Sequence, residues 1–137
     1  MAQKALDTAA LLEFFKDGAA AGQIEELLVH AEKATQRVLI SALSWGDLYL
    51  YAFKQSPATA EKLVKELEML PIEVVTDDEH LELARAAAQF QAEGKTQSIS
   101  DAYAAAVAKV RRAELWTNSK ALAALKGDIK VHYLSEH

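Results

Sequence analysis

The sequence contains no cysteine, which excludes a disulfide framework, a thiolate zinc site and a cysteine nucleophile. It also has no apolar run that approaches the roughly 18–20 residues needed to span a membrane. The N-terminal segment, Met1 to Lys4, lacks the hydrophobic region of a signal peptide. We therefore expect no membrane association and a cytoplasmic location.

Proline and glycine are scarce, with two and five residues in a chain of 137. No Pro/Gly/Ser-rich linker and no internal repeat divides the chain, so residues 1–137 are expected to form a single domain. The apolar fraction of 51% excludes an intrinsically disordered chain and is sufficient for a core. Alanine accounts for 27 residues, which favours helices.

Positive charge is in deficit, since 15 Lys and Arg face 20 Asp and Glu and the net charge is −5. This balance argues against a protein that holds nucleic acid through a basic surface. It does not argue against a metal-dependent nuclease, because bound metal ions would supply the positive charge.

Short β-branched or apolar segments alternate with longer segments of helical spacing. Strands are expected over 3–6, 37–41, 72–76, 114–117 and 129–134, and helices over 8–15, 20–33, 44–55, 57–70, 77–93, 98–112 and 119–126. Such alternation predicts an α/β fold with three α/β/α layers and a central parallel sheet of four to five short strands. In this pattern Ser44 caps the third helix with Asp47 at its N3 position, and Asp77 opens the fifth helix.

Three acidic residues fall where predicted strands and helices meet. Asp7 ends the first strand, Asp47 lies in the first turn of the helix after the second strand, and Asp101 lies in the first turn of the helix before the fourth strand. Functional groups of parallel sheets gather at the carboxyl ends of strands, so these carboxylates can converge on one Mg²⁺ or Mn²⁺ ion. For Asp47 and Asp101 a purely structural role at a helix N-terminus stays open.

Four segments combine an acid or a hydroxyl with the end of a strand or the start of a helix. They are 7–12 (DTAALL), 38–48 (VLISALSWGDL), 98–106 (SISDAYAAA) and 114–119 (ELWTNS). In order and spacing, over nearly the whole chain, they resemble the motifs of PIN-domain nucleases, especially the VapC-type toxins of toxin–antitoxin pairs. The resemblance implies a divalent-metal-dependent endoribonuclease that leaves a 5′-phosphate, with an antitoxin as partner and a homodimeric state.

The resemblance also implies roles for individual residues. Asp7, Asp47 and Asp101 would be catalytic and hold the metal, although the family usually has Glu at the position of Asp47. Ser119 stands at the position of the fourth acid. Thr8, Thr117 and Asn118 are auxiliary candidates that would orient acids or waters, while ordinary structural roles for both threonines stay open.

Other interpretations follow from the same residues. Without a fourth carboxylate, the chain can be a catalytically weakened PIN module that binds RNA or a partner protein without efficient cleavage. A receiver-like signalling domain also has acids at strand ends, but it expects an acidic pair where Asp7-Thr8 supplies one acid.

Two further clusters have a functional and a structural interpretation. Lys109, Arg111 and Arg112 can contact RNA phosphates or stabilise the C-terminus of their helix. The aromatic residues of segment 45–53 indicate a core or a dimer interface more than a base-stacking surface.

Overall fold

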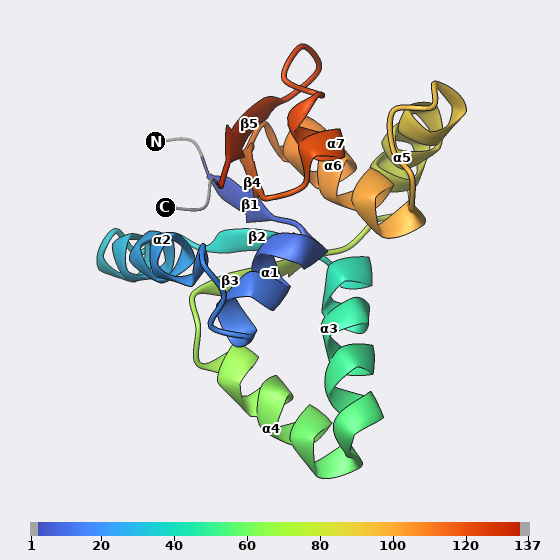
Figure 1. The fold of residues 1–137 in the computed structure, drawn as a ribbon. Coiled ribbons are helices and arrows are strands. Elements are labelled where there is room, and N and C mark those ends of the chain that lie inside the picture. The colour runs from blue at the N-terminus through green and yellow to red at the C-terminus, as the bar shows by residue number, and fades with distance from the viewer. Residues whose placement is uncertain (1–2, 135–137) are drawn as a thin grey trace.

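The computed structural model describes residues 3–134, which form a five-stranded parallel sheet with helices on both faces (Figure 1). The strands are β1 (Lys4–Leu6), β2 (Val38–Ser41), β3 (Ile72–Val75), β4 (Glu114–Thr117) and β5 (Lys130–Tyr133). The helices are α1 (Thr8–Phe15), α2 (Ala21–Lys33), α3 (Ala42–Gln55), α4 (Pro57–Glu68), α5 (Glu82–Ala92), α6 (Ile99–Arg111) and α7 (Lys120–Ala123). The predicted three-layer α/β/α fold is confirmed. No helix of this part of the chain has the length and apolar character of a membrane span.

The strand order β3-β2-β1-β4-β5 places the N-terminal strand in the middle of the sheet. Ala5 of β1 pairs with Leu39 of β2 on one side and with Leu115 of β4 on the other. The chain therefore moves outward from β1 in both directions, and such a switch point opens a crevice at the carboxyl ends of the central strands.

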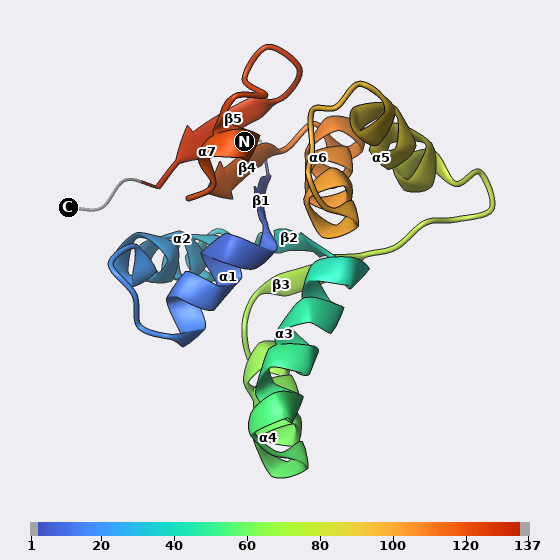
Figure 2. The ribbon, with the colours of Figure 1, turned by 45° about the vertical axis from the view of Figure 1, so that its right-hand side comes forward.

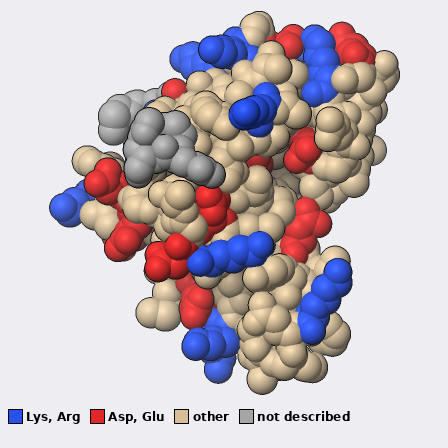
Figure 3. Space-filling view, viewed as in Figure 1, with Lys and Arg blue, Asp and Glu red and all other residues tan. Residues whose placement is uncertain are grey.

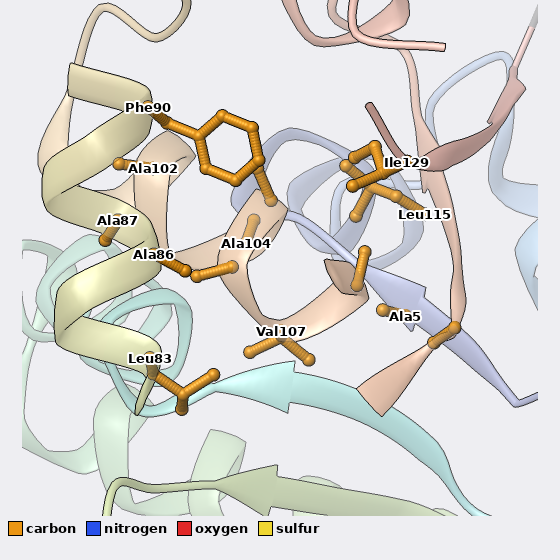
Figure 4. Close-up of a cluster of buried hydrophobic side chains, with 14 of the residues drawn as sticks. Ala5, Leu83, Ala86, Ala87, Phe90, Ala102, Ala104, Val107, Leu115 and Ile129 are labelled. Atoms are coloured by element: carbon orange, nitrogen blue, oxygen red, sulfur yellow. The ribbon is translucent and has the colours of Figure 1, made fainter. Parts of the chain in front are cut away.

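Side chains alternate between the two faces of the central strands, so each face has its own core. Ala5 and Leu39 pack with α5, α6 and α7, whereas Leu6, Val38 and Ile40 pack with α1, α2, α3 and α4. Figure 4 shows the first core, in which Phe90 of α5 points toward α6. All four residues of β2 are buried, as expected for a strand covered on both faces.

The α3–α4 pair is a helical hairpin that extends away from the sheet in both ribbon views (Figures 1 and 2). Ser56 caps α4, with its hydroxyl accepting the N–H of Thr59 at 3.0 Å, and Pro57 occupies the first turn. The hairpin buries Leu48 and Ala52 of α3. On α4 it buries Ala60, Leu63 and Leu67.

The predicted starts of two helices are wrong. Ser41, rather than Ser44, caps α3: its hydroxyl accepts the N–H of Ser44 at 3.0 Å, and the helix begins at Ala42. Asp47 consequently lies in the second turn of α3 and not at N3. The two serines are three residues apart, so the capping pattern fits either of them and the sequence does not separate them.

The fifth helix begins at Glu82, five residues later than predicted. The carboxylate of Asp77 does accept helix N–H groups, but it reaches those of Leu83 and Ala84 at 2.7 and 3.0 Å across a loop. Leu81 ends this loop with a left-handed backbone, φ +55°. In the sequence, an aspartate that caps a helix across a loop looks the same as one that directly precedes the helix. This explains why the predicted start of α5 is wrong.

Candidate active site

Asp7 lies at the carboxyl end of β1, in the crevice that the strand order creates. It is 1% exposed and caps α1, because Oδ1 accepts the N–H of Ala10 at 2.8 Å. Oδ2 accepts a 2.5 Å hydrogen bond from the hydroxyl of Thr117, at the end of the neighbouring strand β4. Asp7 therefore combines a helix cap with a place at the centre of the candidate site.

A row of hydroxyls positions the second acid. The Thr8 hydroxyl lies 2.9 Å from Oδ2 of Asp47 and 3.1 Å from Oγ of Ser44, which lies 3.3 Å from Oγ of Ser41. The single hydrogen of Thr8 favours the charged acceptor, so the Asp47 carboxylate is held toward α1. Ser41 and Ser44 are fully buried, so this row is a fixed part of the core.

The third acid, Asp101, lies in the first turn of α6. Ser98 caps this helix, and its hydroxyl accepts the N–H of Asp101 at 3.0 Å. The side chain is half-buried, and its charge acts on Asp7 while the charge of Asp47 acts on it. Asp7 at the end of β1, Asp47 on α3 and Asp101 on α6 therefore lie within electrostatic range of one another in successive pairs.

Burial and neighbouring carboxylates act on the pKa values of Asp7 and Asp101. Burial raises the pKa of Asp7 to about 6, although the bonds from Thr117 and Ala10 lower it, and the charge of Asp101 adds to the rise. Burial also raises the pKa of Asp101, the hydrogen bond with Ser98 lowers it, and the charge of Asp47 raises it. No Lys or Arg of residues 3–134 forms a salt bridge with any of the three.

The acids are coupled in pairs and do not form a closed cage. Within residues 3–134, no three Asp, Glu or His side chains are grouped closely enough to hold a metal ion. A hydrogen bond from Thr117 orients the Asp7 carboxylate, and one from Thr8 orients that of Asp47. Mg²⁺ is usually held by one or two carboxylates together with waters and substrate phosphates, so these oxygen donors fit a hard divalent ion.

The predicted fourth position lies in the turn between β4 and α7. The N–H of Ser119 donates to the Thr117 hydroxyl at 2.9 Å, and the Ser119 hydroxyl caps α7 by accepting the N–H of Leu122 at 3.4 Å. Thr117 thereby connects Asp7 to this turn. In the described part of the chain, the amide oxygen Oδ1 of Asn118 is buried without a hydrogen-bond partner. Besides the Ser119 hydroxyl, the turn therefore contains a second side-chain oxygen, and this one is unpaired.

The basic cluster lies at the other end of α6 from Asp101. Arg111 makes a bidentate pair with Glu73, at 2.9 and 3.3 Å, and the Lys109 ammonium lies 5.6 Å from the centroid of the Phe90 ring. These contacts give the cluster a structural role.

The aromatic residues of α3 divide between two faces of the helix. Trp45, Tyr49 and Phe53 stack with centroid distances of 5.4 and 6.0 Å, and Trp45 and Tyr49 pack against the core. Their spacing of four places all three on one face, away from Asp47. Tyr51 does not belong to this stack.

Sequence reasoning missed Ser44 as a component of the site, because SxxS reads as a capping pattern. It also missed the relation between Asp47 and Tyr51, which are four residues apart and so share a face of α3. Figure 3 shows acidic side chains in the hollow between the region of α5 and α6 and the region of α3, with basic side chains lower, over α1 and α3.

The sequence of residues 4–127 matches the PIN domain family. The chain belongs to this family. The predicted resemblance is thereby confirmed, and the family is generally one of nucleases that typically use divalent metal ions.

Solved structures with the same fold include toxin–antitoxin proteins. A toxin–antitoxin complex from Klebsiella pneumoniae is 23% identical, with a TM-score of 0.71 over 98% of this PIN-domain chain and 100% of the other. VapBC2 from Rickettsia felis, bound to a DNA fragment from its promoter, is 16% identical, with a TM-score of 0.71 over 96% and 98%. DNA-bound VapBC from Salmonella typhimurium is 19% identical, with a TM-score of 0.67 over 98% and 100%. The comparison with curated proteins gives no significant match.

Proposed function

We propose that this PIN-domain protein is a VapC-type toxin that hydrolyses RNA with the help of Mg²⁺ or Mn²⁺. What supports the proposal is that Asp101 acts electrostatically on Asp7 and Asp47 on Asp101, while no Lys or Arg of the described residues forms a salt bridge with any of the three. Carboxylates whose pKa values are raised by burial and by one another mark a place where a divalent cation is favoured.

Each residue has a defined task in such hydrolysis. Asp7, Asp101 and Asp47 would hold the metal, and Thr8 orients the Asp47 carboxylate. Thr117 fixes the rotation of the Asp7 carboxylate. A bound divalent ion supplies charge neutralisation at the phosphate and a more acidic water. The water oxygen loses a proton and bonds to phosphorus while the bond to the 3′-oxygen breaks. That oxygen takes up a proton, and the products are a 3′-hydroxyl and a 5′-phosphate.

Removing the metal tests this proposal. We expect a 3′-labelled single-stranded RNA to be cut in Mg²⁺ into products with 5′-phosphates, and at least about 100-fold more slowly in EDTA, because the metal contributes several kcal/mol to the transition state. Asp128→Asn, purified identically, serves as the matched control, since Asp128 pairs with Lys95 outside the site. Equal cleavage in EDTA would contradict a metal-dependent nuclease.

Three further properties belong to the same proposal. The structures with this fold include complexes of VapC-type toxins with their antitoxins, which supports an antitoxin as the partner here. Homodimer formation stays a prediction. Leu50 and Phe53 on α3 are exposed and provide apolar surface for a dimer interface. We also propose a cytoplasmic location, where RNA and antitoxin are both available.

The catalytically weakened PIN module remains the second candidate, because Ser119 brings no carboxylate to the turn that contacts Thr117. We expect Ser119→Asp to tighten Mn²⁺ binding about tenfold and to raise cleavage, since an added negative charge near a divalent ion is favourable. In EDTA the same change should lower the melting temperature, because a further carboxylate joins three others. Asp caps helices as well as Ser does, so α7 is preserved.

Ser119→Asn is the matched control for this change, because it has the same shape without the charge. Measuring the melting temperature in EDTA and at increasing Mn²⁺ concentrations gives the change in stability and the change in Mn²⁺ binding in one experiment. If Ser119→Asp and Ser119→Asn shifted the melting temperature equally with and without Mn²⁺, Ser119 would lie outside the site.

A further inference from the structure

A groove of about 190 Å³ lies between the end of α1 and the α3–α4 hairpin. Phe15 of α1, Tyr51 of α3 and Leu63 of α4 form its apolar walls. Gln55, Thr59 and Lys62 add hydrogen-bond donors, and Glu66 is its one carboxylate. The groove therefore joins an aromatic surface to polar groups, as small planar ligands require.

The groove begins one helical turn from the candidate active site. Tyr51 follows Asp47 by four residues, so the two side chains share a face of α3 and are separated by about 6 Å along its axis. Asp47 is oriented toward α1 by Thr8, and the groove lies against the other end of the same helix, at Phe15. A linear ligand that crosses the acids along α1 and α3 therefore reaches Tyr51 next.

The ring of Tyr51 is available to a ligand. Its residue is 39% exposed, and within residues 3–134 it stacks on no other aromatic ring, in contrast to Trp45, Tyr49 and Phe53. The contact on its face is the Lys16 ammonium, 4.8 Å from the ring centroid. Lys16 is exposed and forms no salt bridge with the described residues, so it can leave the ring for an anion.

Positive charge beside the groove attracts a polyanionic ligand, which must also approach the three carboxylates of the candidate site. Lys62 of α4 lines the groove, and Lys16, which follows α1, lies over the ring of Tyr51 in its wall. Lys62 also has no salt-bridge partner in the described part of the chain. A protein helix would need a wider apolar surface than this short groove, which offers one exposed ring and two cations.

We propose that this groove is a nucleotide subsite that receives an unpaired base of single-stranded RNA beside the phosphodiester to be cut. The base stacks on Tyr51, and Lys16 moves from the ring to the adjoining phosphate. Paired bases have no free face for Tyr51, so the subsite selects single strands over duplexes. The inference rests on the proposed ribonuclease function and adds to it a binding position for one base of the substrate.

Binding of a labelled single-stranded oligoribonucleotide tests the subsite separately from cleavage. The measurement uses Asp101→Asn protein in Mg²⁺, so that the oligonucleotide stays intact. We expect added Tyr51→Ala to weaken binding about tenfold, the loss typical for one stacked base, and Tyr51→Phe to restore it. Phe53→Ala is the matched control, because this aromatic ring is on the other face of α3 and should leave binding unchanged.

The phosphate contact has a different signature. Lys16→Gln should reduce the slope of log K against log salt by about 0.7, the value for one phosphate on a single strand, while Tyr51→Ala leaves that slope unchanged. A duplex of the same sequence should show no difference between the parent and Tyr51→Ala.

Equal binding by Tyr51→Ala and Phe53→Ala would overturn the subsite and leave the groove to a protein partner. Weakened binding by Tyr51→Ala, in a protein whose parent form does not cut RNA, would keep the subsite and reject the nuclease. The two failures are therefore distinguishable.

Discussion

Asp7→Asn is expected to reduce RNA cleavage at least about a thousandfold and, without metal, to leave the protein more stable than its parent at pH 8. Asn keeps the shape of Asp and is an equally good N-cap, so the contact with Ala10 survives. The loss of activity comes from the loss of the charge that would hold the metal. The gain in stability comes from the loss of the same charge, because a charged carboxylate is unfavourable at the buried position of Asp7.

The sign of the pH effect follows from the direction of the pKa shift. Burial raises the pKa of Asp7 from its ordinary value of 3.8 to about 6 in the folded protein, so the native state holds an extra proton between these two pH values. Stability therefore falls as pH rises from about 4 to above 6, and the contribution of Asp7 amounts to about 3 kcal/mol. Asn does not titrate and lacks this dependence.

Denaturant unfolding in EDTA at pH 4.5 and pH 8 measures the effect in both proteins. The difference between parent and Asp7→Asn isolates Asp7, since the other titrating groups are common to both. We expect the variant to be the more stable protein at pH 8, by up to about 3 kcal/mol, with a smaller gap at pH 4.5. A gap that does not change with pH would show that Asp7 is not a buried, titrating carboxyl.

Asp101→Asn is expected to lower cleavage at least about 100-fold and to weaken Mn²⁺ binding while the fold survives. Asn retains the size of the side chain and the N–H that donates to Ser98. Removing the charge relieves repulsion from Asp47 and loses a favourable acid in the first turn of α6, so the two effects on stability oppose each other.

Calorimetric Mn²⁺ titration and the RNA assay check this prediction together, with Asp128→Asn as the matched substitution at an exposed salt bridge. Cleavage by Asp101→Asn at the rate of the parent would remove Asp101 from the active site.

The fold was predictable because its signals are local. The run Val38–Ser41 reads as a strand that is buried throughout, and the three-layer arrangement follows from strands alternating with helices. The errors at the starts of α3 and α5 arise where one local pattern has two physical solutions. Ser41 and Ser44 compete for one cap, and Asp77 caps a helix that begins five residues later.

The candidate site was predictable only in part. Its acids stand where predicted strands end or helices begin, whereas the hydroxyls that orient them have no such position in the sequence. Asp7 and Asp101 stand at the ends of elements, where the sequence shows them. The bond from Thr117 to Asp7 depends on β1 and β4 being neighbours, which no local pattern states. The position of Lys16 over Tyr51 likewise depends on the packing of α1 beside α3.

The central place of β1 in the sheet also governs when the site can form during synthesis. Asp7 leaves the ribosome first, but Thr117 follows it by 110 residues, and the edge of β1 that pairs with β4 stays open until then. Contacts of such sequence separation are slow to close and come late in folding. A nascent chain therefore carries Asp7 without the hydroxyl that orients it until the 110 residues up to Thr117 have been made.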